Sequence, residues 1–148
     1  MNLTDYTRET LRGLQGVAVV VETLKSDAEA DGLNTGDLQT DVESKLIEAG
    51  ISVLPHEQWR QTAGHPWLYV SVNTIKYLAS YFFSIDVQLK QDVSLPRDPS
   101  ILTSSATWEL GSIGFAVPQS FPDKIRESVN IYISRFITDF SAVNHPSQ

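Results

Sequence analysis

The sequence that decides the fold lies in the middle of the chain and reads Trp67-Leu68-Tyr69-Val70-Ser71-Val72-Asn73. Apolar and polar side chains alternate here, and successive side chains of a β-strand point to opposite faces of a sheet. Leu68, Val70 and Val72 therefore share one face, and the residues between them share the other. The pattern predicts an antiparallel strand with one dry face and one wet face.

The same alternation returns twice further along the chain, in residues 83–93 and 102–114. Turns at residues 76–80 and 96–99 would join the three strands into a meander. Trp108 falls on the dry side, so we expect it in the core beneath a helix. The polar face would display Tyr69, Ser71, Asn73, Ser84, Asp86, Gln88, Lys90, Thr107 and Glu109.

A strand–helix–strand unit precedes the meander. The β-branched run of residues 17–21 lacks alternation, which favours a strand that is covered on both faces or flanked by strands on both sides, so we expect it inside the sheet. Residues 26–36 read as an acidic loop. Asn34 or Thr35 can cap a helix whose apolar stripe runs to Ala49, with Gly50 as its carboxyl-terminal cap. Residues 51–54 predict a short second strand that Pro55 ends.

A long amphipathic helix is expected from about residue 122 to residue 143, with Asp139 on its water-facing side. Residues 1–14 would form an amino-terminal arm and residues 144–148 a frayed tail. The sequence therefore predicts one α+β domain over residues 1–148. We expect a two-layer sandwich with a mixed sheet of about five strands (β-α-β-β-β-α), strand order 2-1-3-4-5, and two helices on one face.

Composition narrows the possible functions. The chain has 148 residues and a net charge of −7, which argues against nucleic acid as a partner because phosphate binding requires a basic surface. It has no cysteine, which excludes thiolate nucleophiles and cysteine-bound metals. Residues 17–21 form the longest apolar run, far short of the roughly 20 residues of a transmembrane helix. Known nucleotide, cofactor and nucleophile motifs are absent, so we predict no cofactor, no metal and no catalytic residue.

Two functional interpretations remain. The first is a non-catalytic protein-interaction or assembly domain that uses the polar sheet face to bind an unknown protein or a second copy of itself. The second is a small-molecule or metal-binding protein, or an enzyme, with a pocket near Glu22 and the loop carrying His56 and His65. Glu22 ends a buried strand, where α/β folds often bind ligands. The spacing of the two histidines matches no compact metal motif.

Three segments carry a family resemblance: Leu11-Arg12-Gly13-Leu14-Gln15-Gly16-Val17, residues 38–54, and Ile125-Arg126-Glu127-Ser128-Val129. They resemble an uncharacterised family of small bacterial proteins that are often exported. The order of elements is similar to that of the amino-terminal domain of TolB and related envelope lipoprotein domains. The resemblance implies an envelope setting and no catalytic residue. The chain is thus either cytoplasmic as written or periplasmic or exported after removal of a leader.

Overall fold

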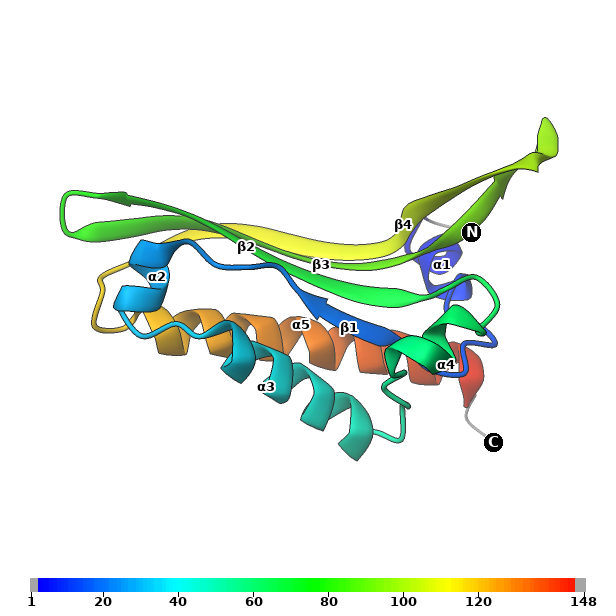
Figure 1. Ribbon diagram of the computed structural model, residues 1–148, viewed down its shortest axis with the longest axis horizontal. Coiled ribbons are helices and arrows are strands. Elements are labelled where there is room, and N and C mark those ends of the chain that lie inside the picture. Colours follow the sequence, from blue (N-terminus) through cyan, green and yellow to red (C-terminus); the bar gives the residue numbers. More distant parts are fainter. Residues whose placement is uncertain (1–2, 146–148) are drawn as a thin grey trace.

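A computed structural model of the chain describes residues 3–145, so residues 1–2 and most of the tail expected at residues 144–148 lie outside the described part. The elements follow in the order α1 (Leu3–Glu9), β1 (Ala18–Val21), α2 (Ser26–Ala30), α3 (Thr35–Glu48), α4 (His56–Arg60), β2 (Trp67–Tyr77), β3 (Ser80–Leu95), β4 (Asp98–Ala116) and α5 (Phe121–Asn144). Figure 1 shows their arrangement.

The strands form one mixed four-stranded sheet in the order β1-β2-β3-β4, so the predicted α+β class is confirmed. β1 runs parallel to β2, and the other neighbours are antiparallel. The fifth strand expected at residues 51–54 is reduced to one bridge between Val17 and Val53. This bridge lies on the side of β1 away from β2, which is where the strand at residues 51–54 was expected. Pro55 has no N–H to continue the ladder and instead precedes α4.

The position expected for the first strand is also corrected. β1 is an edge strand of the four-stranded sheet, and Val20 is 41% exposed. Beyond the Val17 bridge, Gln39 of α3 reaches the outer side of β1, where its Nε2 donates to the Val19 carbonyl at 2.9 Å. A continuous β-branched run therefore marks a strand here but not burial on both faces.

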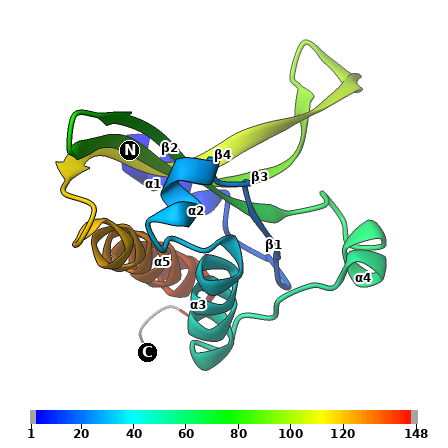
Figure 2. The same ribbon diagram turned by 60° about the vertical axis from the view of Figure 1, so that its left-hand side comes forward.

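The alternation is confirmed for residues 67–73 and 83–89, whereas within residues 102–114 Trp108 is the only buried residue and Leu102 is 68% exposed. Leu68, Val70, Ile85 and Val87 are fully buried on the face toward the helices. Figure 1 shows α3 and α5 on the same side of the sheet, and Figure 2 shows them side by side beneath it. Trp108 lies in the core as expected, with its ring 5.2 Å from that of Phe136 in an edge-to-face arrangement.

Three short helices join the two expected long ones. We expected a loop at residues 26–36, but the segment contains α2. It is ordered because the apolar side chains of Ala28 and Leu33 are almost fully buried. The Tyr81 hydroxyl, which donates to the Asp27 carbonyl at 2.8 Å, ties this segment to β3. α1 belongs to the amino-terminal arm, and α4 is the single turn before the second half of the chain.

The amino-terminal arm is an integral part of the domain, since Leu11 is fully buried. Asn144 fastens it to α5 by accepting from Gly13 N–H at 2.8 Å and donating to the Leu11 carbonyl at 2.9 Å. Asp139, expected to face water, is only 5% exposed. Arg8 Nε donates to Asp139 Oδ1 at 3.2 Å, an ion pair that a helical wheel of α5 alone does not reveal.

Beyond the Trp67–Lys90 pair, β3 and β4 continue without β2 and pair with each other, and Asp92 N–H of β3 donates to the Gly64 carbonyl at 2.8 Å. Figure 1 shows this part as a two-stranded arm that rises away from the body of the molecule. None of the helices within residues 3–145 combines the length and the apolar character needed to cross a membrane.

Candidate functional site

The sheet face opposite α3 and α5, called the open face below, gathers all seven residues that were singled out for the interaction surface. The strand register places Tyr69 beside Gln88 and Ser71 beside Asp86. It continues from Gln88 to Glu109 on β4. Asn73 and Ser84 form the next row. These side chains form a contiguous patch because the three strands keep their period of two in step.

Glu22 joins this patch. Ser71 Oγ donates to Glu22 Oε2 at 2.6 Å, and Asn73 Nδ2 donates to Ser71 Oγ at 3.3 Å. The hydrogen bond from Ser71, followed by that from Tyr69, holds the pKa of the Glu22 carboxyl below its usual value. Glu22, which the sequence placed near a pocket, therefore takes part in a chain of side-chain hydrogen bonds that connects the end of β1 to Ser71 and Asn73 of β2.

Aromatic rings and a lysine complete this end of the open face. The rings of Trp67 and Tyr69 meet edge to face with centroids 5.4 Å apart. Lys90 Nζ lies 5.1 Å from the first ring and 4.7 Å from the second, within reach of cation–π attraction. The Glu22 carboxylate raises the pKa of the Tyr69 phenol. The phenol therefore stays protonated and keeps its hydrogen bond to Glu22.

The opposite end of the open face is apolar, which the sequence interpretation missed. Phe82 lies between Ile75 of β2 and Phe115 of β4 in the register, and Ile113 precedes Phe115 on the same face. These four residues, called the apolar end below, are between 52% and 87% exposed. The available signal was the run Tyr81-Phe82-Phe83, in which large aromatic residues occupy both faces of one strand.

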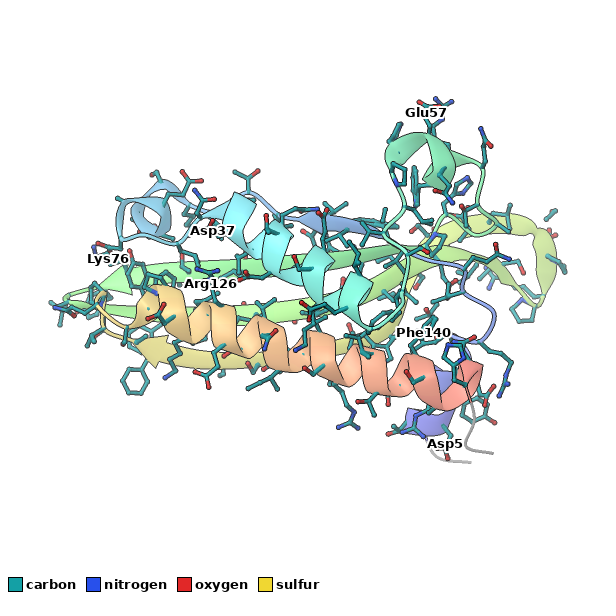
Figure 3. The ribbon with its side chains drawn as sticks, turned by 90° about the horizontal axis from the view of Figure 1, so that it is seen from below. Asp5, Asp37, Glu57, Lys76, Arg126 and Phe140 are labelled. Atoms are coloured by element: carbon teal, nitrogen blue, oxygen red, sulfur yellow. The ribbon has the colours of Figure 1, made fainter. Side chains whose placement is uncertain are left out.

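Two lysines flank the apolar end: Lys25 lines the shallow hollow beside Ile75 and Phe82, and Lys124 Nζ lies 5.6 Å from the centroid of the Phe115 ring. Lys25 Nζ donates to the Thr74 carbonyl at 2.8 Å, and Lys124 Nζ donates to the Phe115 carbonyl at 2.9 Å. Lys76 points to the opposite, helix-covered face, where its Nζ donates to Asp31 Oδ2 at 2.8 Å. Figure 3 shows Lys76 at the hairpin end of the molecule. Lys25 and Lys124 thus place two positive charges beside an apolar patch in a chain whose net charge is −7.

A separate hollow brings together the two predicted histidines. The ring of Trp59 lies between them, 5.8 Å from His56 and 5.2 Å from His65. The hollow has a volume of about 1250 Å³ and extends to Val20 and Trp67 on the sheet. Trp59 Nε1 is buried in this wall and has no hydrogen-bond partner among residues 3–145. Glu22, which we expected here, bonds to Ser71 instead.

His65 is held by two acceptors. Its Nδ1 lies 2.6 Å from Asp92 Oδ2, and its Nε2 lies 3.2 Å from the Arg60 carbonyl. The hydrogen bond to Asp92 raises the pKa of His65, because both ring nitrogens can donate only in the imidazolium form. The backbone at Gly64 and His65 is left-handed, with φ of 80° and 44°, and this turn directs the ring toward β3.

The pair formed by His65 and Asp92 does not extend to a metal site. Within residues 3–145, no three His, Asp or Glu side chains lie in an arrangement that could hold a metal ion. The sequence matches no protein-family model, and no curated protein is detectably similar to it. The open face and the hollow beside Trp59 are therefore the two candidate functional sites within residues 3–145.

Proposed function

We propose that this protein is a non-catalytic interaction or assembly domain that binds a protein partner through its open face, with the apolar end as the anchor. The observation that carries the proposal is the row Ile75, Phe82 and Phe115, joined by Ile113, whose large apolar side chains are all more than half exposed. Soluble proteins rarely expose a contiguous apolar patch of this kind unless it serves an interaction.

The surroundings of the apolar end support a recognition role. Phe82 belongs to β3, which has a strand on both sides, so its position is rigid. The hydrogen-bonded rows around Ser71 and Gln88 supply a polar region beside the anchor, and an apolar centre with a polar rim is typical of protein interfaces. Lys25 and Lys124 favour a partner segment that carries apolar side chains flanked by carboxylates.

Paired substitutions on the surface test the proposal. Partners captured from the native cell by the full-length gene product would be identified, purified and titrated against the wild-type domain. Phe82→Ser should weaken binding at least tenfold, because a central aromatic anchor usually dominates an interface. Ile47→Ser is the matched control, since Ile47 is an equally exposed apolar residue on α3. Unchanged affinity in Phe82→Ser, with loss in Ile47→Ser, would contradict the proposal.

A second candidate function is the binding of a small molecule in the hollow lined by His56, Trp59 and His65. The observation in its favour is the buried, unpartnered Trp59 indole N–H, because a buried donor without an acceptor is destabilising and a ligand oxygen would satisfy it. A thermal-shift screen should find a ligand whose stabilisation falls in Trp59→Phe. Equal stabilisation in Trp59→Phe would exclude this hollow as the binding site.

We include an envelope setting in the proposal, on the strength of the family resemblance of residues 11–17 and 38–54. An exported docking domain needs no cofactor, and its partner would be another envelope protein or a second copy. Fractionation of cells that express the full-length gene product would test this part. Recovery of the protein only from the cytoplasm would remove the envelope setting while leaving the docking role open to the titration above.

A further inference from the structure

We propose that two copies of this chain pair edge to edge through β4, antiparallel, about a two-fold axis near Ile113. β4 ends the strand order, and no strand within residues 3–145 pairs with its outer edge. It is 19 residues long, and after Asp98 its only charged residue is Glu109. Monomeric proteins normally keep such edges short, charged or interrupted by proline, because a long uncharged edge recruits another strand.

The free hydrogen-bonding groups of this edge lie between two fastened points. Lys124 Nζ donates to the Phe115 carbonyl, which therefore points away from β3. The period of two directs the N–H and C=O groups of Gly111 and Ile113 to the same outer side. At the other end, Thr10 Oγ1 donates to the Thr107 carbonyl at 3.3 Å. The intervening segment is thus available to a partner strand, and a strand that pairs as far as Phe115 takes over its carbonyl from Lys124 Nζ.

A second copy fits this segment because the segment complements itself. A two-fold axis at Ile113 places its side chain, 87% exposed in one chain, against its own copy. Phe115 then lies opposite Gly111 of the second copy, and the two apolar ends merge into one surface. Asp86 Oδ1 lies 2.5 Å from the position that a Cβ on Gly111 would occupy, so the carboxylate leans over this edge. Pairing brings it toward the second copy's Lys124.

The helix layer agrees with this arrangement. The Tyr132 hydroxyl of α5 donates to Ser112 Oγ of β4, so α5 follows the same edge. The preceding residue, Ile131, is 57% exposed. Extending the sheet across β4 brings the α5 helices of the two copies together, with Ile131 available to the seam between them. Ile113 and Phe115 belong both to this edge and to the apolar end, but the strand pairing itself uses backbone groups of β4 and does not use Phe82.

Molecular mass in solution provides the first test. The wild-type chain should sediment at twice 16.5 kDa. Ile113→Lys should sediment as a single chain, because a charge on the edge blocks strand pairing. Ile113→Pro should do the same, since it removes only an outward N–H, which edge positions tolerate. Leu102→Lys is the matched control. Leu102 is also exposed on β4 but lies in the two-stranded arm formed by β3 and β4, so this variant should remain a dimer.

Cross-linking locates the axis. The chain has no cysteine, so Ile113→Cys introduces one thiol per copy. Directly opposed residues of antiparallel strands lie about 4.5–5.5 Å apart at Cα, within disulfide range. Mild oxidation should convert Ile113→Cys to a covalent dimer and leave Leu102→Cys largely unlinked. Equal linking of both variants, or of neither, would overturn the edge pairing.

Phe82→Ser separates this inference from the proposed function. Phe82 lies on β3, away from the edge, so edge pairing predicts a dimer that has lost only its partner affinity. A monomeric Phe82→Ser together with a dimeric Ile113→Pro would mean face-to-face association and would overturn the inference. A wild-type chain that sediments at 16.5 kDa at the highest accessible concentration would overturn it as well.

Discussion

Phe82 of β3 lies directly opposite Phe115 of β4, and their ring centroids are 6.4 Å apart on the sheet face that α3 and α5 leave open. The adjacent Phe83 points the other way and contacts the ring of Phe121 at 6.2 Å in the core. Two neighbouring phenylalanines thus serve different purposes, one in packing and the other at the surface.

This division predicts different costs of truncation. Phe83→Ala should lower the free energy of unfolding by about 3–5 kcal/mol, because it leaves a cavity beneath the sheet. Phe82→Ala should lower it by about 1 kcal/mol or less, as is usual for exposed positions. Denaturant unfolding followed by tryptophan fluorescence measures both values. Similar losses in the two variants would contradict the assignment of faces.

Removal of the buried Asp139 carboxylate should lower the free energy of unfolding strongly. Asp139 accepts from Arg8 Nε and, at 3.0 Å, from Trp108 Nε1. Asp139→Ala leaves both donors without this acceptor and should cost about 3 kcal/mol of stability, in the range for breaking a buried ion pair. Asp41→Ala, which removes the half-exposed pair with Arg126, should cost about 1 kcal/mol or less. The same unfolding assay compares them, and an equal cost would contradict the buried role.

The pair of His65 and Asp92 predicts a pH dependence of known sign. The pKa of His65 is raised from 6.5, so its contribution to stability is fully present below pH 6.5 and is lost as the pH rises through the folded-state pKa. Titration by NMR should show the raised pKa in the wild type. Asp92→Asn should bring it back toward 6.5, whereas an unchanged titration would mean that Asp92 does not hold the ring.

The contribution of Glu22 to stability should depend on pH in the opposite direction. The Glu22 pKa is lowered from 4.5, chiefly by the hydrogen bond from Ser71. Its contribution to stability is therefore present above pH 4.5 and is lost as the pH falls through the folded-state pKa. Ser71→Ala should raise the Glu22 pKa, measured by NMR of the carboxyl carbon. Ser84→Ala on the same face serves as the control and should leave that pKa unchanged.

Much of the meander and both long helices could be predicted from local pattern. The N-cap of α3 is Asn34, whose Oδ1 accepts from the Asp37 N–H at 3.1 Å, and α5 spans Phe121–Asn144 close to its expected range. The common face of the seven open-face residues could also be predicted, since a period of two assigns each side chain of a strand to one face. These features depend only on residues that are close together in the chain, so the local sequence pattern is sufficient to predict them.

What only the tertiary structure decided depends on groups far apart in the chain. Residues 51–54 became a single bridge, Asp139 became buried beside Arg8, and Glu22 met Ser71 rather than the histidines. The apolar character of the outer surface at Phe82 also required the register of three strands. The periodicity of a strand or helix states which way a side chain points. Only the packed chain determines what lies there to meet it.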